Sequence, residues 1–201
     1  MDNWARFGLA TRVLKALSNA SVFLFLVLPL VALSNCGGTL AKFTGYEALQ
    51  GTAVSTDNVQ PAIYVTFGAD WWVLAVMIFA AAGLGSAWRG GIPRSLIGGA
   101  AAVSGLIALQ AAIGFFDPPT DVQAGWSPEP ANGGVAIGAA FASVIVFELA
   151  SIAARSWSEA RGTRDRGEWT AIGCVATSFA ILLGLALIVY VLTIATGGCR
   201  C

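Results

Sequence analysis

The sequence predicts an all-α integral membrane protein, a bundle of five transmembrane helices with a cytoplasmic N-terminus and an extracytoplasmic C-terminus. Five apolar stretches fill most of the 201 residues and alternate with short charged segments. Hydrophobic residues make up 57% of the chain and charged residues only 11%, whereas a soluble domain carries about 25% charged residues. So few charges would not cover a water-facing surface, and we therefore expect lipid around the helices.

The absence of histidine restricts the possible functions of the chain more than any motif does. The chain has no histidine and two methionines, although histidine is the usual haem ligand, a common metal ligand and the commonest general base near neutral pH. Phosphate-binding, zinc-protease and serine-hydrolase motifs are also absent from the sequence. We therefore expect that the chain is not an enzyme and binds neither a metal nor a cofactor. The net charge of zero indicates that it has no nucleic-acid partner.

The N-terminal residues 1–18 predict a short interfacial helix that leads into the bilayer. Trp4, Phe7 and Leu14 fall on roughly one helical face, and the basic residues lie off that face. A plain basic flank before the first span is the alternative. The first span is expected at about 16–34, where the roughly 20 apolar residues that a bilayer needs are nearly reached.

Four further spans follow, each bounded by interfacial tryptophan, by a basic turn or by proline and glycine. They are expected at about 71–88, 95–116, 133–154 and 170–196. The loops between them are expected at 35–70 and 117–132 on the outer side and at 89–94 and 155–169 on the inner side.

The two outer loops differ in their local signals. Within the first, residues 43–51 favour a short helix or re-entrant turn, and residues 63–67 alternate as a strand does, although a lone strand is only marginally stable. The prolines and glycines of the second outer loop argue against regular structure there.

The basic residues decide the orientation. One side of the predicted spans carries Arg6, Arg12, Lys15, Arg89, Arg94, Arg155, Arg161, Arg164 and Arg166, and the other carries Lys42 and Arg200. Because basic loops stay in the cytoplasm, the first side is predicted to face the cell interior. The expected location is the plasma (inner) membrane of a bacterium, which the chain crosses several times.

The same predicted topology assigns each cysteine to one side of the membrane. Cys36, Cys199 and Cys201 are placed outside, where thiols oxidise, so a disulfide from Cys36 to one of the other two is a candidate. A second interpretation is that these cysteines carry out thiol–disulfide exchange. A third is lipidation of Cys36, because residues 33–36 resemble a lipobox.

Glu148 is the one charged residue inside a predicted span, where a charge costs roughly 3 kcal/mol or more. We expect it to fasten helices together or to contact another subunit, and ion translocation is the alternative. Gln110, the other intramembrane polar candidate, lies nearer the outer end of its span and is too far in depth to be an obvious partner.

Small residues at helical spacing predict close helix packing, either within the chain or against a partner. The positions are Gly98 and Gly105 in the third span and Gly134 and Gly138 in the fourth.

These observations favour a non-catalytic accessory subunit of a larger bacterial membrane complex, of respiratory or photosynthetic type, whose partners are other membrane protein subunits and lipids. A small transporter or channel that uses Glu148 is the first alternative. A membrane thiol–disulfide oxidoreductase that uses Cys36, Cys199 and Cys201 is the second.

Overall fold

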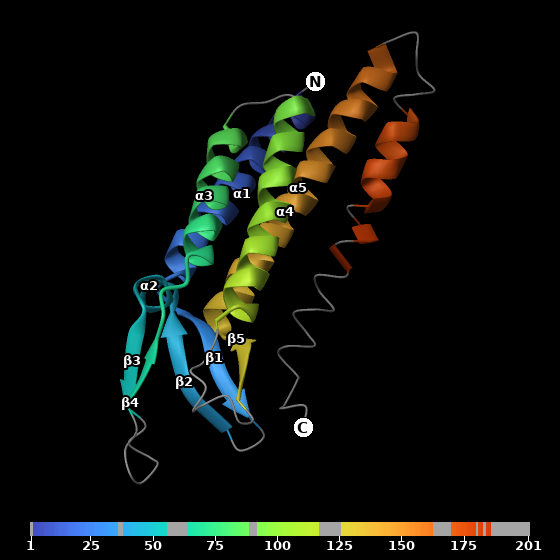
Figure 1. The fold of residues 1–201 in the computed structure, drawn as a ribbon. Helices are drawn as coiled ribbons and strands as arrows, with labels where there is room; N and C mark the ends of the chain where they lie inside the picture. Colours follow the sequence, from blue (N-terminus) through green and yellow to red (C-terminus); the bar gives the residue numbers. More distant parts are fainter. Residues whose placement is uncertain are drawn as a thin grey trace.

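The computed structural model describes most of the chain as a bundle of long helices with a small β-region at one end (Figure 1). The described residues are 2–35, 38–55, 64–88, 92–116, 126–162, 170–179, 181–182 and 184–185. The helices are α1 (Asp2–Phe25), α2 (Gly45–Gln50), α3 (Trp72–Ala87), α4 (Ile92–Gly114), α5 (Asn132–Gly162) and a further helix at Thr170–Phe179. The strands are β1 (Pro29–Asn35), β2 (Gly38–Thr44), β3 (Thr52–Ser55), β4 (Tyr64–Phe67) and β5 (Ser127–Pro130). The prediction of a mainly helical chain is confirmed.

Two helices of the described residues are long and apolar enough to cross a membrane, Ile92–Gly114 and Asn132–Trp157. Two others, α3 and the helix Thr170–Phe179, are apolar but have fewer than 18 residues. Length and composition therefore identify two candidate spans rather than the five expected, and residues 186–196 of the expected fifth span lie outside the described residues.

The N-terminal prediction is wrong in its boundaries. The expected interfacial helix (1–18) and the first part of the expected span (16–34) form one continuous helix, α1, and the chain then turns into strand β1. Leu30, Val31 and Leu33 of β1 are completely buried. A strand that is buried on both faces is a continuous apolar run, which periodicity does not distinguish from a helix.

The outer loops contain sheet, so the all-α prediction is wrong there. One antiparallel sheet has the order β2-β1-β5, and β3 pairs with β4 in a separate hairpin. Strand β5 forms in spite of Pro128 and Pro130, because both belong to an edge strand and stand two residues apart, so that both missing N–H groups point away from β1. Ala131, which directly follows Pro130 and therefore points the other way, donates its N–H to Leu30 O at 3.1 Å.

Three phenylalanines join the β-region to the helices. Phe43 of β2, Phe67 of β4 and Phe116 after α4 are all buried, with ring centroids 4.7 to 5.3 Å apart. Beside them, the N-terminus of α2 is capped by a capping box between Thr44 and Glu47. The β-region is thus fixed to the ends of the helices by an aromatic core and by a short, well-capped helix.

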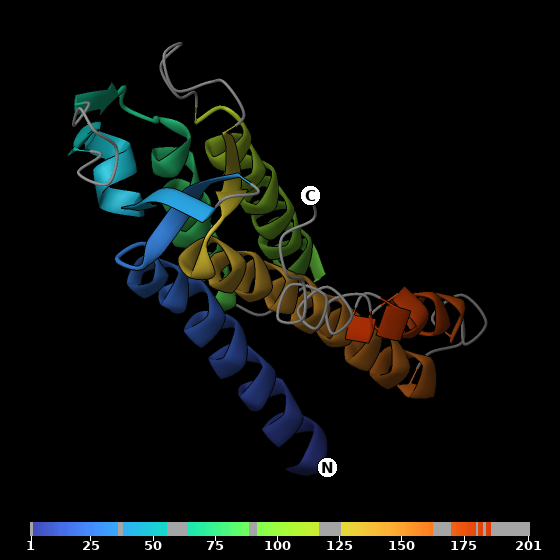
Figure 2. The same ribbon diagram turned by 90° about the horizontal axis from the view of Figure 1, so that it is seen from below.

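The four long helices form a ring. Helix α1 contacts α3 and α5, and α4 contacts the same two, so α1 lies diagonally opposite α4. Viewed from below, α1 and α5 diverge as they leave the sheet (Figure 2). The helix Thr170–Phe179 lies along the far part of α5, where Gly173 packs on the Trp157 ring.

Helix α5 runs further than expected. Residues 155–162 of the predicted inner loop are helical, because no glycine or proline occurs before Gly162 and Arg155 stands four residues before Glu159, a spacing at which opposite charges attract on a helix.

Candidate functional site

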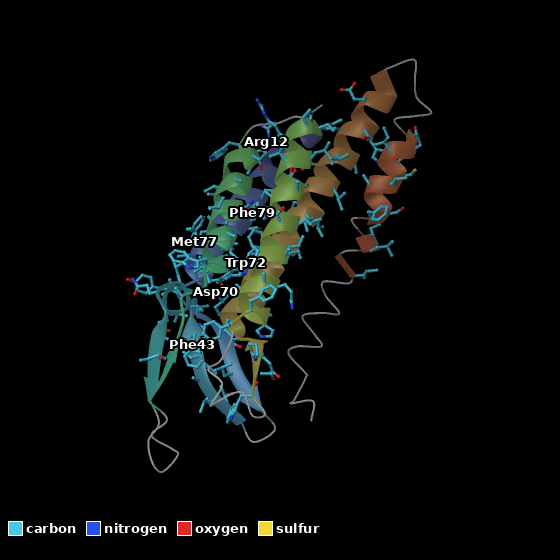
Figure 3. The ribbon with its side chains drawn as sticks, viewed as in Figure 1. Arg12, Phe43, Asp70, Trp72, Met77 and Phe79 are labelled. Atoms are coloured by element: carbon cyan, nitrogen blue, oxygen red, sulfur yellow. The ribbon has the colours of Figure 1, made fainter. Side chains whose placement is uncertain are left out.

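A buried ion pair lies in the half of the bundle away from the sheet. Lys15 of α1 donates from Nζ to Oε2 of Glu148 of α5 at 2.8 Å. The whole residues are only 5% and 3% exposed. Arg12, one turn before Lys15, is labelled in Figure 3 in the part of the bundle away from the sheet, far from Phe43 in the β-region.

The pair is positioned by one face of α1. Thr11, Lys15, Asn19, Val22 and Leu26 are buried and follow one another at intervals of three or four residues, which places them on one side of a helix. The sequence predicted Lys15 only as one of the basic residues on the cytoplasmic side of the spans. The buried face of α1 continues from its apolar residues towards the N-terminus at helical spacing, and this continuation includes Lys15. That periodicity is the sequence signal that marks Lys15 as a candidate partner of Glu148.

Glycine makes the space for the carboxylate. A Cβ at Gly98 of α4 would collide with Oε1 of Glu148 and would lie 2.8 Å from Oγ of Ser86 in α3. Ser86 itself donates to Gly83 O at 2.8 Å. All four long helices therefore meet around the ion pair.

Asn19 adds a second polar layer one turn along α1. Its Nδ2 donates to Lys15 O at 2.9 Å, and the residue is 1% exposed. A Cβ at Gly83 of α3 would collide with Oδ1 of Asn19, and this oxygen has no hydrogen-bond partner among the described residues. Glycine again lets two helices approach where a polar side chain lies between them.

This arrangement is suited to fastening helices together. Two opposite charges at hydrogen-bond distance cancel within the bundle, whereas either charge alone would be buried without compensation. The carboxylate is already bonded and scarcely exposed. Over the described residues there is no group of three or more cysteines, aspartates or glutamates that could hold a metal ion.

The other predicted glycines also lie at contacts. A Cβ at Gly105 would collide with the ring of Phe141, and one at Gly134 would lie 2.6 Å from Leu30 O. Gly138 is looser, since its nearest neighbour, Leu109, is at an ordinary 3.6 Å.

The structure does not bring the remaining predicted residues to this site. Gln110 is exposed on α4 and does not join Glu148. Cys36, Cys199 and Cys201 lie outside the described residues, so their predicted disulfide is not described. Cys174 is an exposed free thiol.

Asp70 is a second buried carboxyl, just before α3 (Figure 3). Its Oδ1 accepts from Trp72 N at 3.0 Å, and its own N–H donates to Ala48 O at 2.8 Å. Burial raises the pKa of Asp70 above its ordinary 3.8, and the bond from Trp72 opposes this rise. Asp70 therefore starts α3 and ties it to α2.

Comparison of the chain with protein-family models, with curated proteins and with solved structures finds no match.

Breaking the ion pair on one side should cost more than removing it entirely. We expect Lys15→Met or Glu148→Met to lower the free energy of unfolding by roughly 3–5 kcal/mol, because each leaves a buried charge alone. The double variant should recover most of this loss. The measurement is a double-mutant cycle of unfolding free energies in detergent micelles.

The matched control is Lys42→Met with Glu129→Met, two exposed charges that flank Ala32 across the sheet. Their coupling should be close to zero. Additive effects of Lys15→Met and Glu148→Met would show that the pair does not hold α1 against α5.

Asp70 should make stability depend on pH. Because its pKa is raised in the folded state, ionising Asp70 opposes folding, so its contribution is largest below pH 3.8 and is lost as pH rises through the folded pKa. Asp70→Asn keeps an acceptor for Trp72 N–H without the charge. We expect this variant to be at least as stable as wild type at pH 7 and the difference to shrink towards pH 4.

Unfolding free energies of wild type, Asp70→Asn and Asp70→Ala between pH 4 and 7 make this comparison. Relative to Asp70→Asn, the alanine variant should be about 1 kcal/mol less stable at every pH, since neither side chain ionises and alanine has no acceptor. An asparagine variant that is clearly less stable than wild type at pH 7 would mean that the ionised carboxylate is stabilised in the folded protein.

Proposed function

We propose that the chain is a multi-pass inner-membrane protein whose four long helices lie in the bilayer with the β-region outside. Large apolar side chains are exposed along α1, α3, α4 and the last described helix. They include Leu17 and Leu24 on α1, Leu74 and Ile78 on α3, Leu96, Ile97, Val103 and Ile107 on α4, and Ile172, Val175 and Phe179 on the last described helix. A soluble monomer rarely exposes so much continuous apolar surface, and lipid is the solvent that suits it.

The dimensions of the apolar band support this placement. Trp72 and Phe115 stack at the sheet end with centroids 6.3 Å apart, and Trp88 and Arg94 lie at the other end. At 1.5 Å per residue, α4 rises about 32 Å from Arg94 to Phe115. This matches the roughly 30 Å hydrocarbon core of a bilayer, with aromatic residues at the interface.

The charges orient the bundle. Arg12, Arg94 and Arg155 lie in the parts of α1, α4 and α5 that are away from the sheet. The sheet end carries Lys42 together with acidic residues such as Glu129. The excess of arginine favours a far end in the cytoplasm and a sheet outside.

Within this membrane protein, the function that the geometry supports best is that of a non-catalytic accessory subunit of a larger complex. The observation that carries this proposal is the closed ion pair between Lys15 and Glu148, which uses the buried charges to hold helices rather than to handle a substrate. The β-region, fixed to the helix ends by three phenylalanines, then offers a rigid outer surface to a partner.

The alternatives have less support. A transporter or channel needs Glu148 to exchange its partner, and Lys15 at 2.8 Å opposes this. The thiol–disulfide oxidoreductase rests on Cys36, Cys199 and Cys201, which lie outside the described residues.

Single cysteines in a cysteine-free chain test the membrane placement. Thr39→Cys on exposed β2 should react with a membrane-impermeant maleimide in intact cells, because the sheet is outside. Glu159→Cys on the exposed end of α5 should react only after the cells are broken. The reverse pattern, or release of the chain by alkaline carbonate, would contradict the placement.

Purification of a tagged chain in mild detergent, followed by mass spectrometry of the intact assembly, tests the subunit function. We expect a stoichiometric complex with other membrane proteins. A chain that elutes without other proteins and moves an ion across reconstituted vesicles, with transport lost in Glu148→Gln, would favour the transporter instead.

A further inference from the structure

Gln110 is a polar side chain on the outward face of α4. It is exposed and makes no hydrogen bond within the described residues. Between Ile97 and Gly114 every other exposed residue of this helix is apolar, namely Ala100, Val103 and Ile107. An amide is therefore presented within an otherwise lipid-like surface.

The depth of Gln110 makes this placement costly in a bilayer. It lies five residues before Phe115, which is about 7.5 Å along the helix from the outer aromatic band. Helical side chains tilt towards the N-terminus of their helix, and the N-terminal end of α4 is the end away from the sheet. The amide is thus directed into the hydrocarbon and not towards the nearer surface, and lipid tails offer it no hydrogen bond.

The surroundings of Gln110 admit another helix. Gly99, Val103, Gln110 and Gly114 recur at intervals of four, seven and four residues and so form one stripe. A Cβ at Gly99 or Gly114 would meet nothing within 4 Å, in contrast to Gly98 and Gly105, which are filled by Glu148 and Phe141. The open glycines let a foreign backbone approach closely.

We propose that a second copy of this chain docks on the stripe of Gly99, Val103, Gln110 and Gly114, through a two-fold contact of α4 with α4. A glutamine amide is both donor and acceptor, so two Gln110 side chains across a two-fold axis satisfy each other, as an isologous interface requires. This dimer rests on the membrane placement proposed above, since in water Gln110 would need no partner. It adds to the accessory-subunit proposal a defined contact between copies.

Cysteine cross-linking in native membranes tests the dimer. In a cysteine-free chain, Gly99→Cys and Gly114→Cys should give a cross-linked species of twice the chain mass under a short oxidising treatment. Ile97→Cys is the matched control, because Ile97 is exposed on the same helix (57%) but lies about a third of a turn or more away from the stripe. Equal cross-linking at Ile97 and Gly114, or none at either glycine, would overturn the proposal.

Gln110 variants test the role of the amide. Gln110→Leu should weaken dimerisation roughly tenfold, by the size of an interhelical hydrogen bond in a membrane, and Gln110→Asn should restore part of it. The unfolding midpoint of each variant, measured in detergent at a dilution where the chain is monomeric, should equal that of wild type, because Gln110 lies outside the core. Unchanged dimerisation of Gln110→Leu would contradict the amide contact, and cross-linking only to a protein of different mass would assign the stripe to another partner.

The two proposals fail in different ways. A chain that resists alkaline extraction but is monomeric in its membrane overturns only the dimer. A chain that alkali releases overturns the membrane placement and the dimer together.

Discussion

The contact between Lys15 and Glu148 constrains the rest of the bundle. A lone charge is costly in a low-dielectric interior, so α1 and α5 are each unfavourable without the other. Their contact fixes the depth of one helix relative to the other, because an ammonium and a carboxylate must meet at hydrogen-bond distance. Helices α3 and α4 can close the ring only if they add no bulk at this depth, and Gly83 and Gly98 meet that requirement.

The interior is divided between two kinds of packing. Away from the sheet, polar side chains are buried and bonded, including Asn19, Ser151 and Ser156, whose donors bond to carbonyls of their own helices. Towards the sheet, the core is apolar and aromatic, from Ile137 and Phe141 to the three phenylalanines of the β-region. The contact between Lys15 and Glu148 sets the relative depth of α1 and α5 at one end, and close packing of rings joins the sheet to the helices at the other.

The glycines of α4 serve two different faces. Gly98 and Gly105 face inwards and are filled by neighbouring side chains, whereas Gly99 and Gly114 are open. One helix can therefore pack closely inside its own bundle and still offer a smooth outer surface. The sequence alone does not separate the two sets, because all four are glycines at comparable spacing and only the rotation of α4 in the bundle distinguishes them.

Sequence by itself determined the apolar helices, the charge asymmetry between the two ends and the single acidic residue within an apolar stretch. These are properties of local composition and periodicity, and they predicted α3, α4 and most of α5 within a few residues. Glu148 was found in the same way, because a charge among apolar neighbours is visible without any contact.

Only the tertiary structure decided the partner of Glu148 and the sheet. Lys15 is 133 residues away in the chain, and although its helical spacing marks it as buried, only the packing of α1 against α5 brings it to Glu148. Strand β1 is paired on one side by β2, the next strand in the chain, and on the other by the distant β5, so its apolar run resembles a helix until both partners are in place. Strand β5, with two prolines, has almost no intrinsic preference for extended pairing and forms because β1 presents a free edge beside it.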